Sequence, residues 1–385
     1  MSSYPPSGPP PTTTLRQRLA DLRGPAVPPR PLDARALAAL AANPGCGRRA
    51  LLDGAGVDKT ALAAALGSPA AFGQSQFAII RGNSFEARVK GDGGAELLRL
   101  VHEHLGAGSE PPGPGAQVPD LTAAGPEGRA ARTALALREA TAAAAASGTW
   151  TLLDHPMLAL EVAGSPAYLE PDAVVVHPDG RWTVVEIKSF PMIDGAADAA
   201  KVGAAARQAA VYVLALEKTA GKLASAVVGH TALLVCPKDF SNLPAAAPVD
   251  IRRERAVTRR QLERLTRVEE LAAALPEGLS FDPERTAEEL ADAVAAVTAA
   301  YAPECLAACE LAFHCRERAR AAGEVTALGR SVRGELGALT TVGEALAAAA
   351  GSDSGSGGPD DPTAASLHHA ARLRAEALEA AACPC

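Results

Sequence analysis

The 385-residue sequence has few aromatic side chains, no long apolar run and no excess of basic residues. Aromatic residues make up only 3% of the chain. No apolar run approaches the length of about 18 residues that a membrane-spanning helix needs. The N-terminal segment lacks a basic region followed by an apolar one, so we expect no signal peptide and predict a cytoplasmic protein with no membrane partner. The net charge of −7 argues against a general basic coat for nucleic acid, although it does not exclude a local basic groove.

Nucleotide-binding motifs are also missing. The segment Gly54–Thr60 has Asp58 where a phosphate-binding loop requires glycine, and no apolar strand leads into it. Neither G-x-G-x-x-G nor G-x-S-x-G occurs in a suitable context. We therefore expect neither ATP binding nor an intrinsic helicase activity.

The overall composition is typical of a globular protein. Apolar residues make up 48% of the chain and charged residues 21%, which excludes wholesale disorder. The length fits two to three domains, or one elaborated enzyme domain with additions. Seven cysteines, an odd number in a protein expected in the cytoplasm, are better explained as thiols or metal ligands than as disulfides.

The apolar pattern along the chain predicts an α/β fold. A meander of three strands is expected at Leu158–Ala163, Tyr168–His177 and Arg181–Ile187, followed by a helix at Ala196–Ala220 and a strand at Ala224–Val235. Helical patterns precede and follow this core. We divide the chain into a disordered Pro-rich tail (1–32) that includes a short helix at 14–23, a helical region (33–149), an α/β core (150–240), a second helical region (241–350), and a flexible linker and tail (351–385).

Two carboxylates and a lysine are predicted to meet at one end of this small sheet. Alternation along a strand places Glu186 and Lys188 on the same face, and the hairpin around Pro178–Gly180 brings Asp172 alongside them. Carboxylates suit a hard divalent cation, Mg²⁺ or Mn²⁺, which polarises a phosphodiester and lowers the pKa of a bound water. The lysine can orient that water. The alternative is an amphipathic hairpin whose polar face carries these charges by chance.

Asp172, preceded by Pro171 and followed by Glu186-Ile187-Lys188, resembles the signature of the PD-(D/E)xK nuclease superfamily. The resemblance implies a restriction-endonuclease-like core, a mixed central sheet flanked by helices. It also implies that Asp172, Glu186 and the main-chain carbonyl of Ile187 hold the cation, while Lys188 positions the attacking water.

Two further elements resemble the RecB-like branch of that superfamily. Gln208 and Tyr212 are four residues apart on one helical face, as in the Q-x-x-x-Y motif that follows the E-x-K strand. The resemblance implies that this pair orients the nucleic-acid strand. Upstream, the segment Arg81–Glu86 resembles the first-helix element of these nucleases, which makes Glu86 a further metal ligand. A half-buried structural tyrosine is the alternative for Tyr212.

One cysteine near the N-terminus and three near the C-terminal part bracket the predicted core. These are Cys46, Cys305, Cys309 and Cys315. Their arrangement is similar to that of the iron–sulfur RecB-like nucleases, including the AddB subunit and exonucleases associated with CRISPR adaptation. The resemblance implies a [4Fe–4S] cluster that ties both ends of the domain together.

The spacing of the triplet departs from the usual pattern, because three residues instead of two separate Cys305 from Cys309. Zinc is the chief alternative metal, with His314 or Cys46 as the fourth ligand. Buried free thiols are the alternative without a metal. Cys236 is expected to be a core thiol, and Cys383 and Cys385 are expected to belong to the tail.

An arginine-rich segment at residues 252–267 predicts a cationic helix face for phosphate contacts. The residues expected to bind nucleic acid are Arg252, Arg255, Arg259, Arg260 and Arg264. A solvated helix whose arginines pair with neighbouring glutamates is an equally good interpretation; those glutamates are Glu254, Glu263, Glu269 and Glu270.

Together these features predict a metal-dependent deoxyribonuclease of DNA repair or defence, an exonuclease or a single-strand-acting enzyme, with a structural [4Fe–4S] cluster. Its expected partners are DNA and proteins of a repair or defence complex. One alternative is a non-catalytic iron–sulfur DNA-binding or scaffold subunit, although a scaffold has no reason to keep all three active-site residues. A zinc-containing structural protein is the third interpretation, and it would make the carboxylate set accidental.

Overall fold

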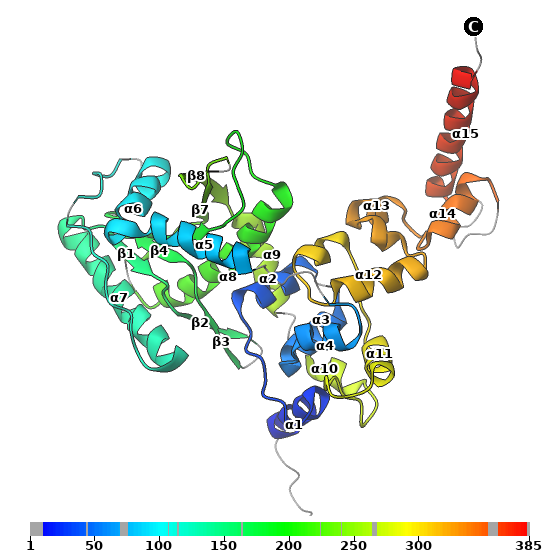
Figure 1. Ribbon diagram of the computed structural model, residues 1–385, viewed down its shortest axis with the longest axis horizontal. Helices are drawn as coiled ribbons and strands as arrows, with labels where there is room; N and C mark the ends of the chain where they lie inside the picture. Colours follow the sequence, from blue (N-terminus) through cyan, green and yellow to red (C-terminus); the bar gives the residue numbers. More distant parts are fainter. Residues whose placement is uncertain are drawn as a thin grey trace, which may run out of the picture.

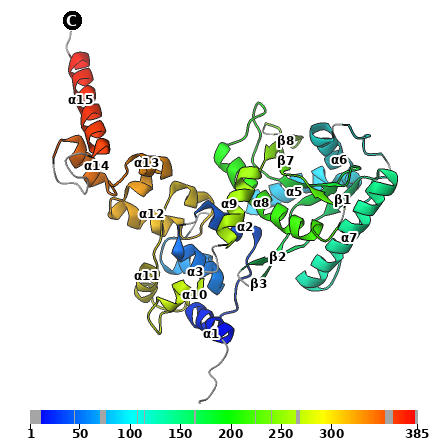
Figure 2. The same ribbon diagram turned by 180° about the vertical axis from the view of Figure 1, so that it is seen from behind.

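The structure is a computed structural model that describes residues 11–43, 45–69, 76–106, 108–113, 115–162, 165–223, 225–239, 241–263, 268–352 and 361–382. It is a mixed α/β protein whose central mixed sheet is flanked by helices. Figures 1 and 2 show an α/β lobe around the sheet and a separate helical lobe, with α2 (Ala34–Ala42) and α9 (Arg252–Glu263) between them.

The central sheet has the strand order β1–β4–β5–β7–β8, and the short β6 pairs with β5. The strands are β1 (Thr151–Asp154), β4 (Ala173–Val176), β5 (Arg181–Ile187), β6 (Val227–Val228), β7 (Thr231–Pro237) and β8 (Pro244–Asp250). β5 is parallel to β6 and β7, and the other neighbours are antiparallel. β2 (Leu158–Val162) and β3 (Ser165–Leu169) form a separate antiparallel hairpin.

Helices cover both faces of the sheet. Four belong to this lobe: α5 (Gln76–Val89), α6 (Gly91–Leu105), α7 (Gly125–Ser147) and α8 (Ala199–Ala220). Val174 and Trp182 pack in a core with residues of α7 and α8, and the Trp182 indole N–H donates to Thr141 Oγ1 of α7 at 3.0 Å. Val175 and Leu233 pack in a second core with residues of α5 and α6. Alternating strand residues therefore divide between two apolar layers, as strand geometry requires.

Several strand boundaries differ from those expected. The run Tyr168–His177 is broken at Glu170 and Pro171 into β3 and β4, because proline has no N–H to donate to a strand partner. The predicted meander is therefore divided between the hairpin and the central sheet, while the β4–β5 hairpin is confirmed. The sequence did not indicate β8, whose Pro244 and Pro248 are tolerated because it is an edge strand.

The helical lobe combines segments from both ends of the sequence. Its core contains buried residues of α1 (Pro11–Arg23), α3 (Gly47–Ala55), α4 (Lys59–Ala65), α10 (Val268–Ala273) and α11 (Ala287–Ala295). The tail predicted over residues 1–32 is thus helical from Pro11 to Arg23, because the Leu22 side chain is buried in this core. Residues 1–10 lie outside the described residues.

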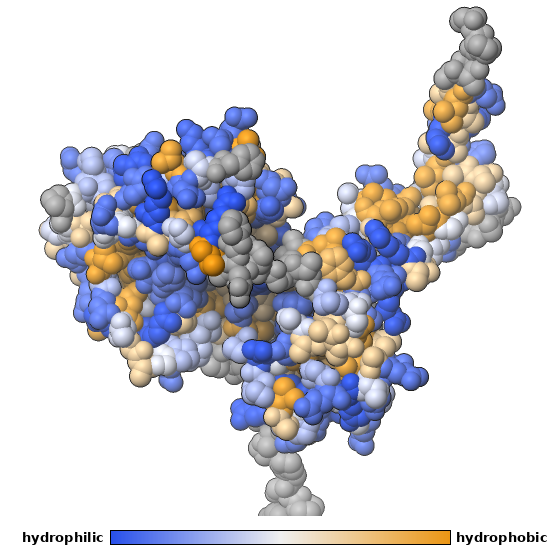
Figure 3. Space-filling view, viewed as in Figure 1, coloured by the Kyte–Doolittle hydropathy of each residue, from blue (hydrophilic) through white to orange (hydrophobic). Residues whose placement is uncertain are grey.

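The C-terminal elements form an arm that leads away from this lobe (Figure 1). They are η3 (Val325–Leu328), α13 (Arg330–Glu335), α14 (Val342–Ala349) and α15 (Pro362–Ala382). Before the arm, η2 (Pro303–Ala307) packs against α2 and α8, and α12 (Ala312–Ala321) carries Cys315, which packs against the core of the helical lobe. Figure 3 shows apolar surface along the arm, where Leu346 and Leu373 are exposed. Among the described helices, none is both long and apolar enough to cross a membrane.

Candidate functional site

Asp172, Glu186 and Lys188 meet at one edge of the central sheet. Ala173 of β4 lies opposite Val185 of β5, so Asp172 comes next to the end of β5. The main-chain N–H of Ile187 donates to Asp172 Oδ2 at 2.6 Å. The Lys188 ammonium lies 3.9 Å from the same oxygen and contacts a carboxylate oxygen of Glu186 directly.

Burial controls the ionisation of this group. The Glu186 side chain is only 2% exposed, and neither of its carboxylate oxygens has a partner in hydrogen-bond geometry. Burial raises the pKa of Glu186 to about 7, and the nearby Asp172 adds to the rise while Lys188 opposes it. Burial also raises the pKa of Asp172, against the effect of Lys188 and the Ile187 N–H. Burial opposes the charge of Lys188, yet Glu186 and Asp172 raise its pKa above the ordinary value.

A second set of charged side chains borders this edge, and the sequence interpretation identified only Glu86 among them. Lys90 Nζ lies 2.6 Å from Glu86 Oε1, 2.6 Å from Asp154 Oδ1 and 2.7 Å from the main-chain carbonyl oxygen of Asp172. His155 contacts the Glu86 and Asp154 carboxylates at 2.9 Å each. The i,i+4 spacing of Glu86 and Lys90 could have indicated this pair. No sequence pattern predicts that the pair contacts Asp154 and His155 at the end of β1.

These contacts favour the charged forms of Glu86, Asp154 and His155. The hydrogen bond from His155 lowers the pKa of Glu86 to about 2, and Lys90 contributes as well. The same two partners lower the pKa of Asp154 to about 2. In turn, Asp154 and Glu86 raise the pKa of His155 to about 9. His155 also has a φ of 43°, a left-handed conformation that is uncommon for a residue other than glycine.

Gln208 and Tyr212 lie on α8 beside the same edge, as the Q-x-x-x-Y spacing predicts, but only one of them is accessible. Gln208 Nε2 donates to the Tyr212 hydroxyl at 2.9 Å, and that hydroxyl donates to the main-chain carbonyl of Glu170 at 3.1 Å. Tyr212 is 2% exposed, so it holds the turn before Asp172 instead of facing a nucleic-acid strand. Arg129 supports the turn from the other side by binding the Glu170 carboxylate at 2.5 Å.

Most of the arginines expected to bind nucleic acid are engaged in ion pairs. Arg255 and Arg259 bind Glu217 of α8, at 2.5 and 2.9 Å, and Arg252 binds Asp250. Arg260 is exposed and has no ion pair within the described part of the chain. Arg264 lies outside the described residues.

The strand register also separates these arginines from the carboxylates. Asp250 of β8 lies opposite Thr231 at the start of β7, whereas Ile187 lies opposite Val235 near its end. α9 therefore begins near the start of β7, whereas Asp172, Glu186 and Lys188 lie near its other end. For Arg252, Arg255 and Arg259, the partners are Asp250 and Glu217 in place of the neighbouring glutamates expected from the sequence.

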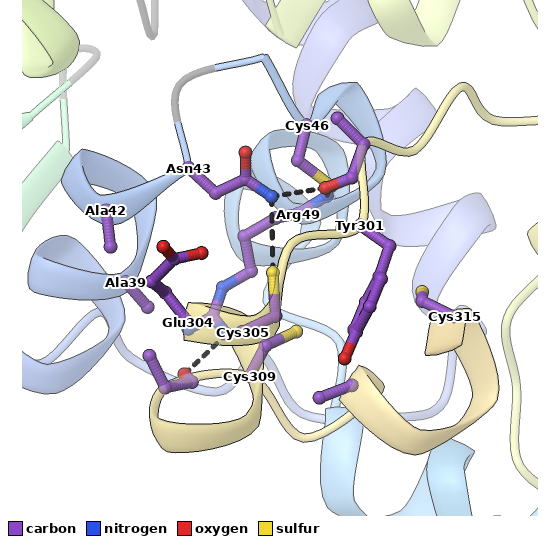
Figure 4. A pocket seen from close by; sticks show the side chains of 13 residues that line it. Ala39, Ala42, Asn43, Cys46, Arg49, Tyr301, Glu304, Cys305, Cys309 and Cys315 are labelled. Carbon is purple, nitrogen blue, oxygen red and sulfur yellow. Dashed lines mark hydrogen bonds between the residues drawn. The ribbon is translucent and has the colours of Figure 1, made fainter. Parts of the chain in front are cut away.

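The four cysteines expected to form a cluster line one pocket (Figure 4). Cys46 caps the N-terminus of α3 and accepts from the Arg49 N–H at 3.4 Å. Cys305 accepts from Asn43 Nδ2 at 3.3 Å. In the view of Figure 4, Tyr301 stands between Cys315 and the other three cysteines. The fold thus brings residues 43–49 and 300–315 together, as the bracketing cysteines predict.

The grouping of ligand side chains is looser than in a formed metal site. In the described ranges, no three His, Cys, Asp or Glu side chains are grouped so that they could hold one metal ion. The donor types nevertheless suit metals: Glu186 offers buried carboxylate oxygens without hydrogen-bond partners, and the pocket offers four sulfurs.

No protein-family model matches the chain, and no curated protein matches it either. Among solved structures, the chain is similar to a protein named SSO0001, with 12% identity and a TM-score of 0.28 over 66% of this chain and 84% of that chain. A likeness this weak carries no argument about fold or function.

Proposed function

We propose that the protein is a metal-dependent nuclease that hydrolyses DNA phosphodiester bonds, at ends or on single strands. The observation that carries the proposal is the meeting of Asp172, Glu186 and Lys188 at one edge of a mixed sheet. Two partly or fully buried carboxylates beside one ammonium form a costly arrangement for a purely structural hairpin. The sheet would then be a restriction-endonuclease-like core.

Asp172, Glu186 and the main-chain carbonyl of Ile187 would hold Mg²⁺ or Mn²⁺, with Glu86 as a further ligand. A bound divalent cation would neutralise charge on the phosphodiester and lower the pKa of the attacking water. The burial of Glu186 supports this assignment, because a bound cation would add to Lys188 in keeping the buried carboxylate charged. Glu86 is already ionised in the ordinary pH range, since its pKa is lowered to about 2.

The remaining side chains of the site have positioning and electrostatic roles. Lys188 donates hydrogen bonds from Nζ, so it can orient a water oxygen near Asp172 and Glu186. Tyr212 keeps Asp172 in place by binding the carbonyl of Glu170, two residues before it. Gln208, which is half-buried, is the member of the pair that a DNA strand could reach.

The four-cysteine pocket is proposed to hold a structural [4Fe–4S] cluster, with zinc as the alternative. Four sulfurs from two distant segments suit either centre. A metal shared by Cys46 and Cys315 would close a loop through most of the chain and so restrict the unfolded state strongly. The proposed setting is a cytoplasmic DNA repair or defence complex.

The direct test uses protein purified without oxygen and end-labelled DNA. Linear single strands, duplexes and circular single strands are incubated with Mn²⁺, with Mg²⁺ or with a chelator. We expect cleavage of linear DNA that needs the cation, and a comparison with the circle separates end-dependent from internal cutting. DNA binding without any cleavage would refute the nuclease and favour an iron–sulfur scaffold subunit.

A further inference from the structure

Arg48 is a buried cation without a carboxylate partner. It directly follows Gly47 at the start of α3 and is 6% exposed. Its Nη1 donates to Cys315 Sγ at 3.1 Å, its Nη2 donates to the Val297 carbonyl at 3.1 Å, and its Nε has no hydrogen-bond partner. Within the described residues, no carboxylate forms an ion pair with it. Among the described residues, Cys315 is therefore the one side chain to which Arg48 donates a hydrogen bond.

The neighbouring Arg49 provides a contrast. It is equally buried, but it binds Asp53 at 2.5 Å and Glu310 at 3.0 Å. Lys59 also binds Asp53, at 2.5 Å. The charges of Arg49 and Lys59 are therefore matched by the two carboxylates, and Arg48 remains as the unmatched positive charge beside the cysteine pocket.

An unmatched buried guanidinium is expensive, because its removal from water costs several kcal/mol by order of magnitude unless an anion compensates it. Four thiolates around a zinc ion or an oxidised [4Fe–4S] core carry about two net negative charges. A metal–thiolate centre in this pocket would supply the anion that Arg48 lacks. The hydrogen bond to Cys315 also points the guanidinium at one ligand sulfur.

We propose that Arg48 is a positioning and charge-compensating residue of the four-cysteine metal centre, holding Cys315 and offsetting the negative charge of the metal–thiolate group. The inference rests on the four-cysteine centre proposed above and assigns a residue that is not itself a ligand. If the centre is an iron–sulfur cluster, one-electron reduction by a reductant such as dithionite adds negative charge. Arg48 stabilises that reduced form and so raises the midpoint potential.

The test compares the parent with Arg48→Met, Arg48→Gln and Arg48→Lys. Arg318→Met is the matched control, because Arg318 lies on the same helix as Cys315 but is exposed. Iron, sulfide and zinc are counted per chain, the midpoint potential is titrated with dithionite, and the rate of metal loss to a chelator is measured. With zinc in place of iron, the rate of metal loss is the readout.

We expect Arg48→Met and Arg48→Gln to have a more negative midpoint potential and to lose metal about 10- to 100-fold faster than the parent. Arg48→Lys, which keeps the charge, should lie closer to the parent, and Arg318→Met should equal it. If Arg48→Met does not fold, the neutral but polar Gln variant carries the comparison.

Parent-like potential and metal loss in the neutral variants would overturn the role of Arg48. If Cys46→Ser loses its metal in the same experiments, the four-cysteine centre would still stand. A parent without iron or zinc, or a Cys46→Ser variant with full metal, would overturn both the centre and the role of Arg48.

Discussion

The main-chain N–H of Ile187 donates a 2.6 Å hydrogen bond to Asp172 Oδ2, so the last residue of β5 fixes the carboxylate that precedes β4. This bond links the two halves of the D…E-x-K pattern directly. The structural role of Asp172 can be tested apart from its charge, because the amide oxygen of an asparagine can accept the same hydrogen bond.

Asp172→Asn should therefore fold like the parent and lose cation-dependent cleavage by at least about 100-fold, since the charge is removed. Asp172→Ala should lose cleavage too, and it should also cost about 1–3 kcal/mol of unfolding free energy because the Ile187 N–H is left without an acceptor. Denaturant unfolding and a cleavage assay on both variants check this. Equal stability of the two variants would contradict the structural part of the prediction.

Tyr212→Phe tests the assignment of Tyr212 as a positioning residue. The variant removes the hydroxyl that binds the Glu170 carbonyl and should cost about 1 kcal/mol of stability. Because Tyr212 is buried, the cleavage rate should fall several-fold while DNA affinity stays the same. Gln208→Ala is the comparison, and affinity should fall there instead. A loss of DNA affinity in Tyr212→Phe without a loss of stability would place the tyrosine on the DNA.

The raised pKa of Glu186 predicts how stability depends on pH in the absence of cation. The pKa of Glu186 is about 7 in the folded chain against an ordinary 4.5. As pH rises, the unfolded chain therefore loses the Glu186 proton before the folded chain does. The contribution of Glu186 to stability is present below about pH 4.5 and is lost as pH rises to about 7. Relative to the parent, Glu186→Gln should gain on the order of 1–3 kcal/mol between these two pH values.

Denaturant unfolding of parent and Glu186→Gln at the two ends of this range measures the difference. Glu161→Gln on β2 is the control, because that side chain is exposed. A difference between parent and Glu186→Gln that does not change with pH would show that Glu186 titrates at its ordinary value.

Arg260 is an exposed arginine of α9 that has no ion pair among the described residues, whereas Arg255 and Arg259 are held by Glu217. Arg260→Glu should weaken DNA binding and reduce the slope of log affinity against log salt by about 1. Arg374→Glu on the projecting helix α15 is the charge-matched control (Figure 1). Identical salt slopes for parent and Arg260→Glu would make α9 a solvated helix.

Cys46→Ser should lose metal and solubility together, because a centre shared with Cys315 contributes to folding. Cys383→Ser is the control, at a position outside the described residues and far in sequence from the triplet. Iron and zinc per chain are measured in both variants beside the parent. Full metal content in Cys46→Ser would refute the four-cysteine assignment and leave the carboxylate site unaffected.

The parts of the site that lie within one hairpin could be predicted from the sequence. Strand alternation and a short turn suffice to bring Asp172 beside Glu186 and Lys188. The contact of Lys90 with Asp154 could not be predicted, because it joins a helix to a strand end more than sixty residues later. The pairing of Arg255 with Glu217 was missed for the same reason, since a glutamate on the preceding helix competes with those nearby in sequence.

Local chemistry also decided where the strand prediction failed. The apolar run around residues 168–177 predicts one continuous strand. In the structure, β3 ends at Leu169, before Pro171, and β4 begins at Ala173, after the turn. That break is what places Asp172 at the sheet edge, in contact with Ile187 and held through Glu170 by Tyr212.

The most direct test of the nuclease proposal is the rate at which Lys188→Met releases nucleotides from linear single-stranded DNA in Mn²⁺. Lys238→Met is the matched control, because Lys238 is an exposed lysine just beyond β7, next to the same edge of the sheet. We predict that the parent and Lys238→Met cleave at the same rate, that a chelator stops both, and that Lys188→Met is slower by at least about 100-fold. Cleavage by Lys188→Met at the parent rate would contradict the proposed site.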